Sequence, residues 1–109
     1  MRIDKPAPGS EAALRRLWQQ AFHDDDAFLD IFFDVAFSHD RCRCVTIDGE
    51  IVAVLYWFDC SCCGQRMAYL YAIATDKDRR GQGLCRALME DTHRHLVSRG
   101  YVADRKSVV

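Results

Sequence analysis

The apolar and polar positions of the first part of the chain predict a short strand and two helices. Arg2–Lys5 fits an edge strand and ends at Pro6, which cannot donate to a strand ladder. Beyond it, apolar residues recur at the spacing of one helix face: Leu14, Leu17, Trp18, Ala21 and Phe22. A second helix is expected from Asp24 to about Ser38. It is apolar on most sides, so we expect it to pack against a sheet.

Three aspartates interrupt this second helix, at positions 26, 30 and 34. Their four-residue spacing places them on one helix face. We interpret this acidic stripe as a solvated face, and attraction of a cationic amine is the alternative.

The middle of the chain predicts three strands in antiparallel succession, followed by a helix. Asp48-Gly49 is a hairpin signal between two segments rich in β-branched and aromatic residues. Gly100 is placed to end the helix in a left-handed conformation. The expected elements are strands at Arg41–Ile47, Glu50–Asp59 and Gln65–Thr75, a turn at Cys60–Gly64, a helix from Gly81 to about Arg99, and the start of a strand at Tyr101–Ala103.

Composition and charge narrow the class of protein. A chain of 109 residues with 50% hydrophobic residues fits one globular domain at most. A net charge of −1 gives no reason to expect a nucleic-acid partner. The longest apolar run, Ile51–Phe58, is too short to span a membrane, and Met1–Ser10 does not resemble a signal peptide. We therefore expect a cytoplasmic protein without a membrane partner.

The chain has six cysteines, of which those at positions 42 and 44 form a CxC pattern and those at 60, 62 and 63 a CxCC pattern, while Cys85 stands apart. Neither pattern has the two-residue gap common in structural zinc sites, so we expect no metal. Most are interpreted as reduced thiols that behave like small hydrophobic side chains. A cysteine-based metal or redox protein remains the weakest of three functional hypotheses.

The loop Arg80-Gly81-Gln82-Gly83 joins the last complete strand to the last helix. Glycines in that position let backbone amides face an anion, and the helix dipole adds positive potential. Arg79 and Arg80 would suit a pyrophosphate. The loop is neither a P-loop nor a GxGxxG dinucleotide fingerprint, and alone it is a weak signal.

The segment YAIATDKDRRGQGLCRALMED, residues 71–91, resembles the acetyl-CoA-binding segment of the GNAT superfamily of N-acetyltransferases. Its signature is Arg/Gln-x-x-Gly-x-Gly/Ala, matched by Arg80 and Gly83, whereas Cys85 replaces the final small residue. The predicted order of elements also resembles the family order as far as the strand begun at Tyr101. The resemblance implies a mixed α/β fold with a central, mostly antiparallel sheet.

The resemblance also implies a site and a reaction. The pantetheine arm of acetyl-CoA would lie against the backbone of Ile73, Ala74 and Thr75. The pyrophosphate would be held by the amides of Arg80, Gly81, Gln82, Gly83, Leu84 and Cys85, with Arg86 nearby. Acetyl-CoA is the expected co-substrate, and the acceptor is a primary amine on a small molecule or peptide. A homodimer is compatible with the full-length protein.

Catalytic residues are not identified by the sequence. Attack by an amine requires a base or a water chain, yet Gln65–Thr75 contains no carboxylate. Tyr69 and Tyr71, expected on the same strand face as Ile73, are interpreted as packing residues. Cys85 is interpreted as a small packing residue, with a reactive thiol as the alternative. A non-catalytic module that binds acyl-CoA is the second functional hypothesis.

The last six residues, DRKSVV, are what GAT CGG AAG AGC GTC GTG of a common sequencing adapter encodes. We therefore expect residues 1–103 to be a partial GNAT domain and residues 104–109 to be a non-native tail. A chain that lacks the rest of the family fold is expected to be inactive and poorly soluble.

Overall fold

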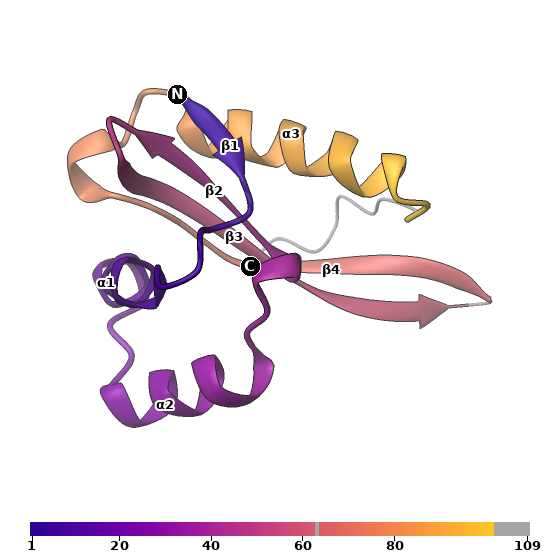
Figure 1. Ribbon diagram of the computed structural model, residues 1–109, viewed down its shortest axis with the longest axis horizontal. Coiled ribbons are helices and arrows are strands. Elements are labelled where there is room, and N and C mark those ends of the chain that lie inside the picture. Colours follow the sequence, from indigo (N-terminus) through magenta and orange to yellow (C-terminus); the bar gives the residue numbers. More distant parts are fainter. Residues whose placement is uncertain (63, 102–109) are drawn as a thin grey trace.

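The computed structural model describes residues 1–62 and 64–101. Within them, four antiparallel strands form one sheet in the order β1-β2-β3-β4. The strands are Arg2–Asp4, Cys42–Ile47, Glu50–Cys62 and Gln65–Thr75. Helices α1 (Glu11–Phe22) and α2 (Asp26–Ile31) lie on one face of this sheet, and α3 (Leu84–Ser98) lies on the other (Figure 1). This mixed α/β architecture is the predicted one.

One of the two hairpins has the turn that the sequence predicts, and the other does not. Asp48 and Gly49 have φ values of 52° and 81°, as a two-residue turn between twisted strands requires. The turn expected at Cys60–Gly64 is shorter than predicted. Strand β3 continues to Cys62, which pairs with Gln65, and the β3–β4 hairpin therefore projects beyond the helices (Figure 1).

The predicted helix from Asp24 to Ser38 is α-helical only to Ile31 and ends at Ala36. Helix α2 gives way to a π-helical turn at Phe32–Ala36, closed by a 2.9 Å bond from the Phe37 amide to the Phe32 carbonyl. The wider turn lets Phe32 and Phe37 both contact Tyr56, with ring centroids 5.4 and 6.2 Å away.

The three aspartates of the acidic stripe are exposed, and α1 approaches the first two of them, Asp26 and Asp30. Arg15 of α1 pairs with these two, at 3.6 Å from Asp26 and 2.9 Å from Asp30. One arginine therefore offsets part of the negative charge of the stripe, whose three members stay exposed to solvent as interpreted.

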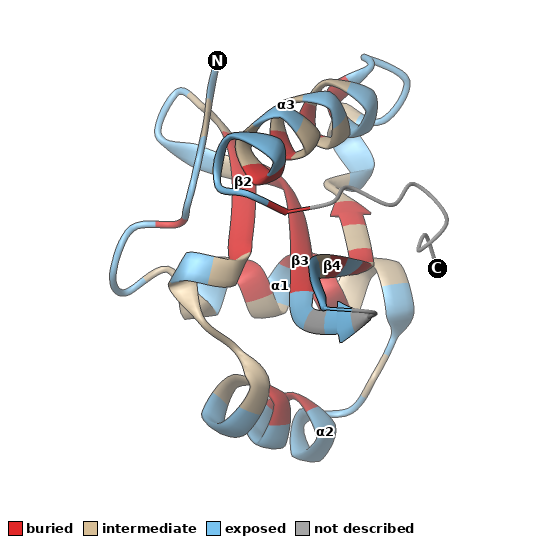
Figure 2. Cartoon of the chain, turned by 90° about the vertical axis from the view of Figure 1, so that its right-hand side faces the viewer, coloured by how far each residue is buried: buried red, intermediate tan, exposed pale blue. Residues whose placement is uncertain are grey.

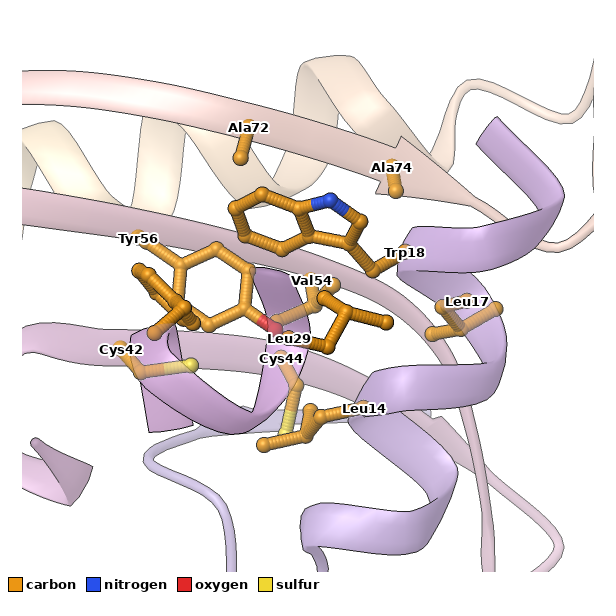
Figure 3. Packing of buried hydrophobic residues seen from close by; sticks show 11 residues of the cluster. Leu14, Leu17, Trp18, Leu29, Cys42, Cys44, Val54, Tyr56, Ala72 and Ala74 are labelled. Atoms are coloured by element: carbon orange, nitrogen blue, oxygen red, sulfur yellow. The ribbon is translucent and has the colours of Figure 1, made fainter. Parts of the chain in front are cut away.

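Each sheet face carries its own core, seen as the buried centre of Figure 2. On the α1 face, the indole of Trp18 lies beside Tyr56 and below the methyl groups of Ala72 and Ala74 (Figure 3). On the α3 face, α3 presents a row at four-residue intervals, Leu84, Leu88, Thr92 and Leu96, to β3 and β4.

Two cysteines behave as buried apolar residues. Cys42 and Cys44 project from β2 into the α1-face core (Figure 3), and burial raises the pKa of both thiols. Of the other positions in the CxC and CxCC patterns, Cys63 lies outside the described residues. Among the residues that are described, no three metal-ligating side chains come together.

Residues 102–109 also lie outside the described part of the chain. The predicted strand beyond Tyr101 and the predicted non-native tail at residues 104–109 both fall there. Among the residues that are described, no helix combines the length and the hydrophobicity needed to cross a membrane.

Candidate functional site

The segment after β4 is anchored by Asp76. Its amide donates to the Val52 carbonyl at 2.7 Å, which keeps the end of β4 on the sheet. Its carboxylate accepts from the Asp78 amide at 2.9 Å and pairs with Arg16 of α1 at 3.0 Å. These two contacts lower the pKa of Asp76, the Asp78 amide contributing most. One side chain thus fixes the start of the loop to the strand and to α1.

Two glycines then turn the chain into α3. Gly81 and Gly83 have φ values of 80° and 74°, a region that other residues enter only at a cost. A Cβ on either residue would meet no atom within 4 Å. The backbone conformation, not a lack of space, is therefore what requires glycine here.

The turn leaves donors at the start of α3 without an internal acceptor. The helix begins at Leu84, three residues later than predicted, and Gly83 caps it without a side chain. The Ala87 amide donates to the Gly83 carbonyl at 3.0 Å, while the earlier amides of the first turn have no carbonyl one turn back within the helix. The first turn carries no acidic side chain. Such a turn can bind an anion through main-chain groups.

The three side chains of this first turn have different roles. Leu84 is buried against the sheet and holds the helix in place. Arg86 pairs with Glu90 at 3.2 Å. Cys85 is an exposed free thiol, so the expectation that it packs as a small residue is wrong.

Strand β4 contains a β-bulge that the sequence analysis missed. The pairing shifts by one residue between Val54, opposite Ala74, and Tyr56, opposite Tyr71. The extra residue lies at Ala72–Ile73, and Ala72 takes a φ of 52°. A left-handed turn in a strand is usually marked by Gly or Asn, and the sequence Tyr-Ala-Ile-Ala carries no such mark.

The bulge changes which sheet face each residue of β4 meets. Tyr71 and Ala72 contact the α1-face core, whereas Ile73 packs on the α3 side. The prediction that Tyr69 and Tyr71 share a face with Ile73 is therefore wrong, because it assumed uninterrupted alternation.

The three β4 residues predicted to hold pantetheine begin within the bulge, at Ile73, and lie on the outer strand of the described sheet. An antiparallel edge strand presents alternate amides and carbonyls away from its neighbour, where an extended ligand can pair with them. The Arg80 side chain donates from Nε to the Thr75 carbonyl at 3.3 Å. The predicted strand residues and the predicted loop residues are therefore brought together at one sheet edge.

The tyrosines near the bulge are held in their neutral form. Burial is the main cause that raises the pKa of Tyr71 and of Tyr56, and nearby Cys42 adds to it in both cases. Tyr71 stacks on Phe58, with centroids 4.3 Å apart. These features support the interpretation of Tyr71 as a packing residue.

An open apolar groove of about 730 Å³ lies between the α1–α2 segment and the outer half of β3 and β4. It reaches the bulge at Tyr71 and Ala72. Asp24 is the only carboxylate among the described residues that line it, and it accepts from Trp18 Nε1 at 2.8 Å. The other lining residues are apolar or aromatic: Trp18, Phe22, Phe28, Ile31, Phe32, Val35, Ala36, Phe58 and Tyr69.

A strand edge followed by a glycine turn at a helix start is the arrangement that the family resemblance implies. The sequence model of the acetyltransferase (GNAT) domain matches residues 2–103. The chain belongs to the GNAT acetyltransferase family. GNAT membership supports an acyltransferase, and GNAT acetyltransferases in general use acetyl-CoA. No curated protein sequence matches the chain.

Solved GNAT structures share the fold at low sequence identity. A ribosomal-protein-alanine N-acetyltransferase from Brucella melitensis biovar Abortus 2308 is 17% identical, with a TM-score of 0.77. That comparison covers 100% of this chain and 80% of the other. An aminoglycoside acetyltransferase from an uncultured soil metagenomic sample is 18% identical, with a TM-score of 0.71 and coverages of 99% and 74%. A Trypanosoma brucei acetyltransferase is 16% identical, with a TM-score of 0.70 and coverages of 99% and 80%.

Proposed function

We propose that this protein transfers the acetyl group of acetyl-CoA to a primary amine by direct attack. One observation carries the proposal: the bulged edge of β4 leads, within a few residues, to the glycine turn at the start of α3. A pantetheine arm that pairs with Ile73, Ala74 and Thr75 would bring its pyrophosphate to the amides of Arg80–Cys85, with Arg86 nearby. A main-chain amide at the bulge would then polarise the thioester carbonyl.

We place the acceptor in the apolar groove. The groove shares Tyr71 and Ala72 with the bulge, so an amine bound in it would lie beside the expected thioester. Its lining favours an amine that carries an aromatic or aliphatic group, since an apolar wall gains free energy from apolar contact. Asp24, the single lining carboxylate, would attract the cationic form of that amine.

The second candidate is a module that binds acyl-CoA without catalysis. The exposed Cys85 at the signature position and the neutral state of Tyr71 favour it, since neither supplies a base. The experiment that separates the two is acetylation of an amine panel by the purified full-length protein, followed by mass spectrometry of the products. The panel contains an arylalkylamine, a polyamine and a peptide amine. Acetylated arylalkylamine above the uncatalysed level supports the enzyme. Binding of CoA by calorimetry, with no product from any amine, would identify the module instead.

A further inference from the structure

The carboxylate of Asp24 lies in surroundings that are otherwise apolar or aromatic. The apolar groove extends to the bulge at Tyr71 and Ala72, and Asp24 is the only carboxylate among the described residues that line it. Its Oδ2 accepts from Trp18 Nε1 at 2.8 Å. In the described part of the chain, its other oxygen, Oδ1, forms no hydrogen bond or ion pair. That oxygen is therefore available to a molecule bound in the groove.

The indole of Trp18 holds this carboxylate toward β4. Trp18 is buried in the same core cluster as Ala72 and Ala74. Figure 3 shows the indole nitrogen on the edge of the ring that faces β4, between the methyl groups of these two alanines. Because Asp24 is bonded to that nitrogen, its carboxylate lies on the side of the groove toward the bulge.

Unusual backbone conformations occur on both sides of the apolar groove. In the described part of the chain, three residues other than glycine have a positive φ: His23 at 56°, and Asp48 and Ala72 at 52°. Asp48 belongs to the β2–β3 turn, whereas Ala72 lines the groove and His23 directly precedes Asp24. Such conformations are costly, and they concentrate at functional sites. The backbone at His23 turns the chain out of α1 and places Asp24 on the groove wall.

The other candidate proton acceptors near the apolar groove are engaged or neutral. Asp25 accepts from an amide in the first turn of α2 at 2.9 Å, and Asp26 pairs with Arg15. Neither of them lines the groove. Burial raises the pKa of Tyr71, which keeps this phenol neutral and makes it a weak proton acceptor. Among the described residues of the groove, Asp24 is the remaining group that can take a proton from an amine.

We infer that Asp24 is the base that takes a proton from the bound ammonium. This rests on the proposed function, in which an amine in the apolar groove attacks the thioester. An N–H bond breaks, its electron pair stays on nitrogen, and the proton bonds to Oδ1 of Asp24. The nitrogen then attacks the thioester carbon, the C–S bond breaks with its electron pair on sulfur, and a second amine proton converts the thiolate to a thiol. Asp24 is partly exposed, so it returns its proton to water.

The apolar lining favours this proton transfer. An ammonium beside a carboxylate brings two charges into an apolar groove, whereas an amine beside a carboxylic acid brings none. Both charges are therefore lost together when the proton moves. The low polarity of the groove thus offsets the weak basicity that a carboxylate has in water.

The test measures acetylation by the full-length protein with two amines of the same shape. β-Phenylethylamine is a cation at neutral pH, whereas much of its β,β-difluoro analogue is uncharged there because fluorine withdraws electrons. Asp24→Asn keeps an oxygen for Trp18 Nε1 but cannot take the proton. It should lower kcat/KM for β-phenylethylamine by about 100-fold or more, the usual contribution of a general base. The loss with the difluoro analogue should stay below about tenfold, because that amine needs no proton removed before attack.

Added bases distinguish removal of a proton from attraction of a cation. Imidazole is mostly neutral at about pH 8, so it can accept a proton but supplies no negative charge. In Asp24→Ala it should raise the rate with β-phenylethylamine by about tenfold, with little effect on the wild-type protein. If imidazole does not restore activity, with or without rescue by acetate, the inference is overturned and the proposed function stands.

Asp34→Asn is the matched control, since it removes the same charge from an exposed aspartate that does not line the apolar groove. It should change kcat/KM for either amine by less than about twofold. Calorimetry with coenzyme A checks the fold of Asp24→Asn, which should bind as the wild-type protein does, and Asp24→Ala repeats the comparison independently. Equal losses with both amines in the two Asp24 variants would indicate a structural effect and overturn the inference. If the wild-type protein acetylates neither amine, the proposed function fails and the inference falls with it.

Discussion

Replacing Gly83 with alanine tests whether the turn before α3 contributes to the stability of the fold or to the binding of coenzyme A. Gly83 has a φ of 74° and open space where a Cβ would stand, so the substitution perturbs only the backbone. A left-handed conformation costs an alanine about 1–2 kcal/mol. Alanine also restricts the conformations of the unfolded chain, and this offsets about 0.4–1 kcal/mol of the cost.

This cost can appear in either of two measurements. If the turn keeps its shape, the folded chain bears the strain, and a loss of 1 kcal/mol lowers the Tm by about 4–8 °C. If the turn relaxes, stability is retained, but the amides of α3 must be realigned before coenzyme A binds. Affinity then falls by about fivefold to thirtyfold, the equivalent of about 1–2 kcal/mol.

Gly9→Ala is the matched control, because Gly9 has a φ of 85° and equally open surroundings in the loop between β1 and α1. It should lower the Tm without affecting the ligand. Thermal unfolding and calorimetry with coenzyme A on both variants give the comparison. If Gly83→Ala keeps the wild-type Tm and also binds coenzyme A as Gly9→Ala does, the turn is not an anion site and the reasoning fails.

Three further predictions concern the fold and its exposed thiol. Leu88→Ala should cost about 2–5 kcal/mol in urea unfolding, since Leu88 is fully buried, whereas Val97→Ala on the exposed side of α3 should stay within about 0.5 kcal/mol. The pKa of Asp76 is lowered in the folded state, so its ionised carboxylate stabilises the fold above the unfolded value of about 3.9 and this contribution is lost as pH falls further. The stability difference between the wild-type chain and Asp76→Asn should therefore shrink between pH 5 and pH 3, and a constant difference would contradict the assignment. Iodoacetamide should label the exposed Cys85 faster than the buried Cys42 and Cys44, and coenzyme A should slow the labelling of Cys85, as peptide mapping would show.

Most helices and strands could be predicted because their patterns are local. The apolar row of α1, the Asp48-Gly49 turn and the left-handed Gly100 each depend on a few neighbouring residues, and each has its expected form. The π-helical turn after Ile31 could not be predicted. Its cause is a tertiary contact, the packing of Phe32 and Phe37 on Tyr56, and a pattern of apolar residues does not reveal that contact.

In the candidate site, too, only the features with a local sequence signal could be predicted. Gly81 and Gly83 could be found because a positive φ selects for glycine and leaves a mark in the sequence. The bulge at Ala72 leaves no mark, since an alanine is held in a glycine-like conformation by the pairing on both sides of it. The error about the face of Ile73 follows directly from that missing signal.

The proposed acetyl-CoA site is built from main-chain groups, whereas the proposed amine site is built from side chains, and different conclusions follow for the two substrates. The proposed acetyl-CoA site depends on backbone shape at a strand edge and a helix start, which many sequences can adopt. This is consistent with shared folds at 16–18% identity. The apolar groove depends on particular side chains, among them Trp18, Phe28 and Tyr69, and shape alone does not define what binds there. Substitutions in the groove should therefore change the choice of amine, while substitutions in the turn should change the affinity for the coenzyme.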